Sequence, residues 1–149
     1  MPDIVKAAAS DRTAVEALVE ASYSHYIARI GARPGPMLDD YASSIARGHV
    51  NLLRGDGGIE GVLVLIPEED CLLLDNIAVS PAAQGKGYGR LLMDHAEAEA
   101  RRLGFRRIRL YTHELMTENQ AIYARRGYVE THRQEQKGLK RVFMEKALD

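Results

Sequence analysis

The chain has 149 residues, the length of one compact domain, and we expect a single domain over residues 1–149. Hydrophobic residues make up 46% of it and charged residues 28%, which is typical of a globular protein. The 20 basic and 21 acidic side chains nearly cancel. No overall charge therefore favours nucleic acid or an anionic membrane as a partner.

The sequence also indicates the cellular compartment of the protein. The longest apolar stretch, Gly61–Pro67, is too short to span a bilayer, and the N-terminal residues lack the basic and apolar segments of a signal peptide. The single cysteine, Cys71, cannot form an intrachain disulfide, which fits a reducing environment. We therefore expect a cytoplasmic protein with no membrane partner.

The pattern of apolar residues and turn signals predicts alternating strands and helices. In chain order it predicts a strand at Ile4–Ala8, a helix from Ser10 or Asp11 to Ile30, a loop at Gly31–Pro36, a helix at Leu38–Ala46, strands at Val50–Leu53, Gly61–Ile66 and Cys71–Val79, a helix at Gly87–Leu103, a strand at Arg107–Thr112, a helix from Thr117 to Gly127, and strands at Tyr128–Gln134 and Arg141–Leu148. Thr117 and Gln120 have the spacing of a capping box. The order of elements predicts a mixed α/β sandwich with one right-handed strand–helix–strand crossover.

The most informative segment is a glycine-rich loop between a buried strand and a helix. Because glycines lack Cβ atoms, Gly85, Gly87 and Gly89 allow backbone N–H groups to approach a large anion closely. The first turn of the following helix adds unpaired N–H donors and a partial positive charge. Such a loop predicts a phosphate-binding site.

The spacing of this loop excludes two common nucleotide-binding motifs. A Walker A loop requires Gly, four residues, Gly-Lys and then Ser or Thr, but Ser80 takes the place of the first Gly and Gly87 that of the hydroxyl. A Gly-x-Gly-x-x-Gly fingerprint that begins at Gly85 would place Arg90 at its last Gly. Both motifs therefore fail.

The spacing Gln84-x-x-Gly87-x-Gly89 instead resembles the acetyl-CoA motif of the GNAT family of N-acetyltransferases. That motif is Gln or Arg, two residues, Gly, one residue, then Gly or Ala. The resemblance implies a GNAT-type fold, a central mixed and mostly antiparallel twisted sheet flanked by helices on both faces. It also implies acetyl-CoA as the cosubstrate that donates the acyl group.

A second segment matches the same family. Tyr123, Gly127 and Tyr128 have the family's spacing of Tyr, three residues, Gly and an aromatic. The family's common Asn falls about seven residues before that Tyr, where this chain has Met116, whereas Asn119 lies only four before it. The resemblance is strongest from Leu74 to Tyr128.

The resemblance implies direct transfer of an acetyl group to a primary amine of a small molecule or peptide. The strand end before the loop is expected to carry a bulge at Ile77–Val79 that frees backbone groups for the cofactor. The implied acetyl-CoA contacts are Ile77, Ala78, Val79, Gln84, Gly85, Lys86, Gly87, Tyr88, Gly89, Arg90, Asn119 and Tyr123.

Three residues are candidates for proton transfer. A phenol with pKa near 10 can donate to a thiolate with pKa near 8.5, so Tyr123 is a candidate general acid, with a core aromatic as the alternative. The incoming amine must lose a proton before it attacks. Asp75 interrupts an apolar strand and His113 ends a strand on the side that the family uses for substrate. Either can serve as base and substrate contact, or make a structural hydrogen bond.

The acceptor side has few diagnostic residues. Tyr26 and Tyr41 are candidates for its wall, with helix packing as the alternative. Asp39 and Asp40 can attract a cationic amine or cap a helix. Cys71 lies at the far end of its strand from the loop, so we interpret it as a core residue and not as a nucleophile.

Several functional alternatives remain open at this point. No grouping of His, Cys and carboxylates has zinc-ligand spacing, so we expect no metal. A catalytically silent module that binds acyl-CoA as a sensor is the alternative to an enzyme, and another acyl group or an O-acceptor is a third possibility. The final hairpin leaves a strand edge that makes a homodimer plausible.

Overall fold

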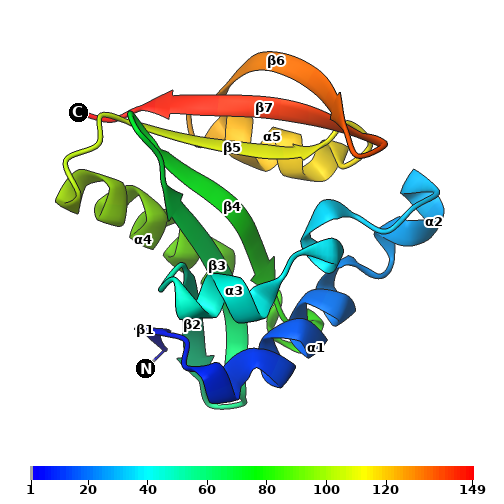
Figure 1. Cartoon of the computed structure of the whole chain (residues 1–149), viewed down its shortest axis with the longest axis vertical. Helices are drawn as coiled ribbons and strands as arrows, with labels where there is room; N and C mark the ends of the chain where they lie inside the picture. The colour runs from blue at the N-terminus through cyan, green and yellow to red at the C-terminus, as the bar shows by residue number, and fades with distance from the viewer. Residues whose placement is uncertain (1) are drawn as a thin grey trace.

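The computed structural model describes residues 2–149, which form a seven-stranded sheet with helices on both faces (Figure 1). The strands are β1 (Asp3–Lys6), β2 (Val50–Gly55), β3 (Gly58–Pro67), β4 (Leu72–Val79), β5 (Arg107–His113), β6 (Val129–Gln136) and β7 (Leu139–Ala147). The helices are α1 (Arg12–Tyr23), α2 (Tyr26–Ile30), α3 (Tyr41–Ala46), α4 (Tyr88–Arg102) and α5 (Thr117–Arg125). Short 3-10 turns occupy Ala9–Asp11, Gly35–Leu38 and Pro81–Ala83.

The strand order in the sheet is β1-β2-β3-β4-β5-β7-β6. Among the pairs formed within residues 2–149, only β4 and β5 run parallel, and α4 makes the crossover between them. The predicted mixed, mostly antiparallel sheet with helices on both faces is therefore confirmed.

The sheet opens at its centre, between β4 and β5. The two strands pair only from Leu72 to Leu74, opposite Ile108 to Leu110, although β4 continues to Val79. Figure 1 shows β4 turning away from β5 beyond this point. Within residues 2–149 the second half of β4 therefore lacks a partner strand on its β5 side, and its backbone groups there are available to a ligand.

The predicted bulge lies earlier in β4 than expected. Ile77, Ala78 and Val79 pair with β3 in regular register, so the expectation of a bulge there is wrong. The register shifts where Val64 faces Asn76 and Leu65 faces Leu74, which leaves Asp75 as the extra residue. The backbone beyond Leu74 is freed by the separation of β4 from β5 together with a bulge at Asp75.

Two apolar cores lie on opposite faces of the sheet. On one face α4 and α5 cover residues such as Leu74 and Leu110. On the other face α1 and α3 cover residues such as Val62 and Val64. Cys71 is buried, as predicted for a core residue. Because both faces of the central strands are covered, β3 and β4 carry the nearly continuous apolar runs seen in the sequence.

The first predicted helix is divided in two. α1 ends at Tyr23 and α2 begins at Tyr26, because Ile27 N–H donates to the Ser24 carbonyl (3.1 Å) in a tighter turn. Both tyrosines remain buried on the same face, so the apolar spacing continues through the break. Asp11 stands at the N-cap of α1 without capping it, because its carboxylate accepts from the N–H of Ala8 (2.8 Å).

Two other helix starts differ from the prediction. The second helix begins at Tyr41 and not at Leu38, and Asp40 caps it by accepting from Ser43 N–H (3.1 Å). The capping box of Thr117 and Gln120 is wrong, because Thr117 is already inside α5 and Met116 holds the N-cap position. The Gln120 amide instead donates to the carbonyls of His113 and Glu114 and fastens the turn between β5 and α5.

Candidate active site

The loop between β4 and α4 has the backbone form that its glycines predict. Gly85 and Gly87 have φ of +88° and +81°, the left-handed region that glycine adopts without strain. No heavy atom of residues 2–149 would lie within 4 Å of a Cβ at Gly85, Gly87 or Gly89, so the backbone here faces open space. Because α4 begins at Tyr88, the N–H groups of its first turn have no intrahelical acceptor.

A cavity of about 770 Å³ extends from this loop along the free end of β4 to α5. Its lining includes Ser22, Tyr23, His25 and Tyr26 of the N-terminal helices, Ile77, Ala78 and Val79 of β4, Gln84, Gly85, Gly87, Tyr88, Gly89 and Arg90 of the loop and α4, and Glu118, Asn119, Ile122, Tyr123, Arg125 and Arg126 of α5 and its end. The volume lies within the range of small-molecule and cofactor sites. An open loop, free N–H groups and flanking arginines suit a phosphate-bearing ligand.

Lys86 is placed differently from its neighbours in the loop. It does not line the large cavity, and its Nζ lies 3.9 Å from a carboxylate oxygen of Glu60 and 5.9 Å from the ring centre of Tyr88. Glu60 is buried at the start of β3, where it also accepts from Gly57 N–H (3.3 Å). This lysine therefore links the loop to the β2–β3 turn.

A second, smaller cavity of about 40 Å³ lies where β4 separates from β5. Its walls include Asp75 of β4, Tyr111 and His113 of β5, and Arg141 of β7, together with the segment Pro34–Pro36. Since about 10–15 Å³ of such space holds one water molecule, the cavity has room for a few waters or a small end group. A ligand can therefore introduce only a small end group here without displacing a wall.

Four residues line both cavities, and they mark the junction between them: Tyr23, Ile77, Asn119 and Tyr123. The Tyr123 side chain is buried, and its hydroxyl has no hydrogen-bond partner within residues 2–149. Burial raises the pKa of Tyr123 above the ordinary value of 10, with a smaller contribution from Tyr26. The phenol therefore keeps its proton at neutral pH.

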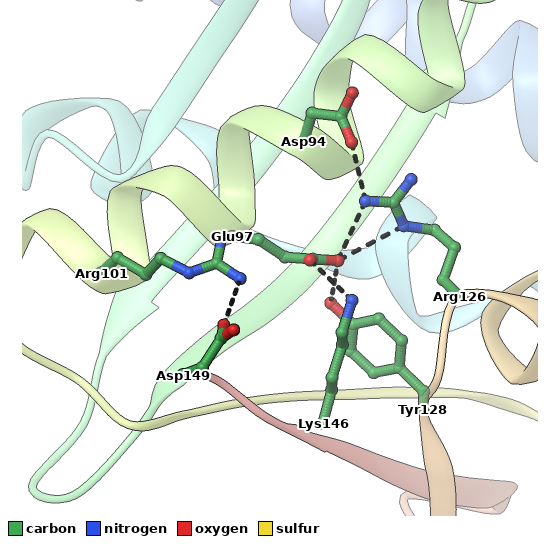
Figure 2. Close-up of polar contacts among 7 residues, drawn as sticks. All are labelled: Asp94, Glu97, Arg101, Arg126, Tyr128, Lys146 and Asp149. Carbon is green, nitrogen blue, oxygen red and sulfur yellow. Dashed lines mark hydrogen bonds and ion pairs between the residues drawn. The ribbon is translucent and has the colours of Figure 1, made fainter.

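The end of α5 that carries Tyr123 is held by a buried ionic cluster (Figure 2). Glu97 of α4 accepts hydrogen bonds from Lys146 (2.8 Å), Arg126 (3.0 Å) and the Tyr128 hydroxyl (3.3 Å). Burial alone would raise the pKa of Glu97, but the hydrogen bonds from Lys146 and Arg126 outweigh it, so the pKa is lowered and Glu97 stays ionised.

Tyr128, which follows α5 and belongs to this cluster, also contacts Tyr123 directly. Tyr128 N–H donates to the Tyr123 carbonyl (3.0 Å), and the two rings pack edge to face with centres 6.2 Å apart. The Glu97 cluster therefore fixes α5 against α4 and so fixes Tyr123 relative to the glycine loop. The family spacing indicated Tyr128, but no sequence signal indicated Glu97.

Asp75 lies in the wall of the smaller cavity beside a second carboxylate. It accepts a hydrogen bond from the Tyr111 hydroxyl (2.7 Å). Burial and the neighbouring Asp75 raise the pKa of Asp39 to about 6, against the opposing effect of Arg141. The sequence did not predict Tyr111 as a site residue, although its alternation along β5 placed it on the same face as His113.

His113 also lines the smaller cavity. Its Nδ1 accepts from the N–H of Leu115 (3.1 Å), so the neutral ring carries its proton on Nε2 and presents an N–H donor there. Burial lowers the pKa of His113, and this outweighs the effect of Glu114. The ring therefore favours its neutral form, and its one acceptor nitrogen, Nδ1, is occupied by the Leu115 N–H.

A buried hydrogen-bond chain links the junction to the wall of the smaller cavity. The Tyr23 hydroxyl lies 2.8 Å from both the Asn76 Oδ1 and the Ile77 carbonyl oxygen. Asn76 Nδ2 donates to the Tyr41 hydroxyl (2.9 Å), which donates in turn to the Pro36 carbonyl. The sequence missed Asn76, because one polar residue in an apolar strand does not show where its side chain lies.

The two tyrosines proposed for the acceptor wall occupy different places. Tyr26 lines the larger cavity, where the guanidinium of Arg29 lies 5.1 Å from its ring centre. Tyr41 lines neither of the two joined cavities and instead contributes to a separate one of about 190 Å³. Asn119 lies at the junction, and its amide nitrogen is 3.7 Å from the Met116 sulfur.

Two further features concern metals and membranes. Within residues 2–149 no three His, Cys, Asp or Glu side chains are grouped so as to hold a metal ion. In the same residues no helix is long and apolar enough to cross a membrane.

Comparison with known proteins identifies the family. The model of the acetyltransferase (GNAT) family matches residues 15–128. Because this match covers most of the chain, the chain belongs to the GNAT acetyltransferase family. The resemblance inferred from the glycine loop and from Tyr123, Gly127 and Tyr128 is confirmed.

Among curated proteins the chain is similar to parts of longer acetyltransferases. It is 33% identical to N-alpha-acetyltransferase 80 of Mus musculus over 87 residues, which are 58% of this chain and 23% of that protein. It is 42% identical to mycothiol acetyltransferase of Geodermatophilus obscurus over 52 residues, 35% of this chain and 17% of that protein. The matched segment thus spans less than a quarter of either relative.

Solved structures agree along the whole chain. PaiA N-acetyltransferase from Thermoplasma acidophilum, in complex with coenzyme A, superposes with a TM-score of 0.80 at 18% identity and covers 99% of both chains. The ribosomal-protein-S18-alanine N-acetyltransferase of Escherichia coli gives a TM-score of 0.79 at 18% identity, with 100% of this chain and 95% of that chain covered. At this identity the likeness shows a shared fold.

Proposed function

We propose that the protein is an acetyl-CoA-dependent N-acetyltransferase that transfers the acetyl group directly to a primary amine of a small molecule or peptide. The observation that carries this proposal is the position of Tyr123 at the junction of the two cavities. One cavity has the features of a phosphate-bearing cosubstrate site, and the other contains candidate bases. A proton donor at their junction would lie beside the sulfur whose bond to the acetyl group breaks.

The larger cavity is the proposed acetyl-CoA site. The N–H groups of Gly85, Gly87 and the first turn of α4 would bind the pyrophosphate, since the helix end adds a partial positive charge. The free edge of β4 at Ile77–Val79 would hydrogen-bond the pantetheine. Bound there, acetyl-CoA supplies a reactive thioester. Support comes from the coenzyme A in the PaiA structure, a protein of the same fold.

The smaller cavity is the proposed acceptor site. An amine arrives as an ammonium ion with a pKa near 10.4 and must lose a proton before its nitrogen attacks the acetyl carbon. Asp75 and His113 both line this cavity. Asp75 can take that proton directly or through a water, whereas His113 can do so only if its Nδ1 releases the Leu115 N–H. As the new carbon–nitrogen bond forms, the carbon–sulfur bond breaks, and the sulfur leaves with the electron pair.

Tyr123 would donate its proton to that sulfur, and the second proton that the nitrogen loses as the amide forms would restore the phenol. Its hydroxyl is not engaged elsewhere within residues 2–149, and burial keeps it protonated. Proton donation by a positioned side chain typically accelerates a reaction by about 10²- to 10⁴-fold. Asn119 and the arginines of the larger cavity would complete the contacts to the cosubstrate.

The alternative function is a sensor that binds acyl-CoA without turnover. The test is release of the coenzyme A thiol from acetyl-CoA across a panel of polyamines, amino acids, aminoglycosides and N-terminal peptides. We expect turnover with at least one amine, at a rate above the hydrolysis of acetyl-CoA alone. Tight acetyl-CoA binding without turnover on any amine would contradict the enzyme and favour the sensor.

Location and assembly are part of the same proposal. We place the protein in the cytoplasm, where acetyl-CoA and reduced thiols occur together. β6 forms the edge of the sheet, so a homodimer would pair through this strand. Sedimentation of the wild type and of a variant with proline in β6 tests that interface.

A further inference from the structure

The wall of the proposed acceptor site contains a cation with unused hydrogen-bonding capacity. The guanidinium of Arg141 lies over the ring of Tyr111, 4.2 Å from the ring centre. Its one hydrogen bond within residues 2–149 goes from Nη1 to the Gln136 side-chain oxygen (2.7 Å), and no carboxylate of these residues forms an ion pair with it. Most of its N–H donors are therefore free.

The packing around Arg141 holds the guanidinium in place. The guanidinium stacks on the Tyr111 ring, and a Cβ added to Gly35 would lie 3.0 Å from Arg141 Nη2, so the loop backbone also packs closely against it. The side chain is half-buried and remains reachable from solvent. A planar guanidinium that is stacked on an aromatic ring and fixed at one nitrogen presents a ready-made fork for a carboxylate.

Tyr111 links the guanidinium of Arg141 to the carboxylate of Asp75. The Tyr111 ring carries Arg141 on its face, and the Tyr111 hydroxyl donates to Asp75. Both Asp75 and Arg141 line the smaller cavity next to Tyr123. The site therefore presents a proton acceptor and a carboxylate receptor, joined through one side chain.

The size of the cavity determines how such a ligand would enter. With about 40 Å³ of space, the cavity has room for a small end group such as an amino group. The rest of the ligand would then lie at the half-buried wall, where the free donors of Arg141 lie. An ammonium group at Asp75 and a carboxylate at Arg141 would satisfy both charges at once.

We propose that the acceptor is an amino acid or a closely similar small zwitterion, whose carboxylate is bound by Arg141 while its amino group faces Asp75 and Tyr123. This inference rests on the proposed acetyltransferase function and specifies its substrate class. Because hydrogen bonds to charged groups contribute about 1.5–3 kcal/mol each, loss of the guanidinium should lower kcat/KM for such an acceptor by about 10- to 100-fold.

The test compares amino acids with their primary amides, pair by pair, by thiol release from acetyl-CoA. For the best pair the wild type should prefer the amino acid by about tenfold or more, although the amide has the less basic amine. Arg141→Met should abolish that preference, because it should lower turnover of the amino acid much more than turnover of the amide. Arg141→Lys, which keeps the charge without the planar fork, should restore it only in part.

The control is Arg133→Met, which removes an exposed arginine from the neighbouring strand β6, outside both cavities. It should keep the wild-type preference, and acetyl-CoA affinity should be unchanged in every variant. Equal or better turnover of the amides by the wild type, or an equal loss on both members of a pair in Arg141→Met, would overturn the assignment and leave acetyl transfer standing. No turnover with any amine, with acetyl-CoA still bound, would overturn both proposals.

Discussion

The two halves of the site recognise their ligands by different means. The larger cavity presents backbone groups, namely the loop from Gly85 to Gly89 and the free edge of β4. The smaller cavity presents side chains, Asp75, Tyr111, His113 and Arg141, which come from three strands. Backbone recognition requires glycine at fixed positions, whereas side-chain recognition can be assembled from many combinations of residues.

This difference explains why the sequence predicts the cofactor half of the site better than the acceptor half. A loop that must hold pyrophosphate cannot vary much, because φ near +80° and close approach both select glycine. An acceptor site changes with each substrate, and its chemistry depends on which side chains the fold brings together. The following variants separate the two halves, beginning with the largest expected effect.

Gly87→Glu should abolish acetyl-CoA binding. Gly87 has φ of +81° and faces open space at the start of α4, so a glutamate there adds both backbone strain and a negative charge next to the proposed pyrophosphate. We expect the dissociation constant measured by calorimetry to rise by about 100-fold or more, which is roughly 3 kcal/mol.

The matched control for this change is Gly104→Glu. Gly104 follows the other end of α4, has φ of +85° and also faces open space, so the strain and the charge change are the same. It should lose similar stability and keep wild-type acetyl-CoA affinity. Similar affinity losses in both variants would mean that Gly87 acts through folding. Retained affinity in Gly87→Glu would disprove the proposed pyrophosphate site in the glycine loop.

Asn76→Leu should affect mainly the acceptor half. The substitution breaks the chain from Tyr23 through Tyr41 to Pro36, and Pro36 is part of the acceptor wall. We expect the KM for the amine to rise by about tenfold, with unfolding destabilised by about 1–3 kcal/mol and acetyl-CoA affinity unchanged. Steady-state kinetics and thermal unfolding measure the two effects.

The control for Asn76→Leu is Asn51→Leu. Asn51 is also a buried asparagine in the sheet and donates to the Leu63 carbonyl (3.3 Å), but it lines neither of the joined cavities. It should cost comparable stability and leave the amine KM unchanged. If both variants raise the amine KM alike, Asn76 has no specific part in the acceptor wall.

Asp39→Asn should give the smallest effect, a change in how stability depends on pH. Because burial and Asp75 raise the pKa of Asp39 from 3.8 to about 6, the folded protein holds this proton more tightly than the unfolded chain does. The contribution of Asp39 to stability therefore falls as pH rises from 3.8 to about 6, and is constant above that.

Asp39→Asn removes this loss of stability at high pH, because asparagine does not ionise. It should match the wild type near pH 4 and unfold about 2–4 °C higher above pH 7, the response of a domain of this size to roughly 1 kcal/mol. The exposed Asp56→Asn is the control and should follow the wild type at both pH values. Equal melting temperatures for Asp39→Asn and the wild type at pH 7 would show that Asp39 and Asp75 do not interact.

The features of the molecule that depend on the backbone were predicted well from the sequence. The order of strands and helices along the chain, the crossover helix α4 and the loop geometry at Gly85 and Gly87 follow from local signals such as apolar periodicity and glycine spacing. The break after Tyr23 was missed, because buried tyrosines three residues apart fit a continuous helix as well as a tightened turn.

The side chains of the proposed acceptor site were predicted only in part. Asp75 and His113 were singled out by their residue types, and the fold brings both to one cavity. Tyr111, Arg141 and Asn76 were not, because their contacts join strands and loops far apart in the sequence, and no local pattern encodes such pairings. The bulge at Asp75 was misplaced for the same reason, since strand register depends on the partner strand.

The most direct test of the central claim is the Tyr123→Phe variant, with acetyl-CoA affinity and the rate of acetyl transfer measured on the same preparation. If Tyr123 donates the proton at the junction of the two cavities, kcat should fall by about 10²-fold or more. The dissociation constant for acetyl-CoA should stay within about threefold, because the proposed phosphate contacts come from other residues. Wild-type kcat in this variant would contradict the account.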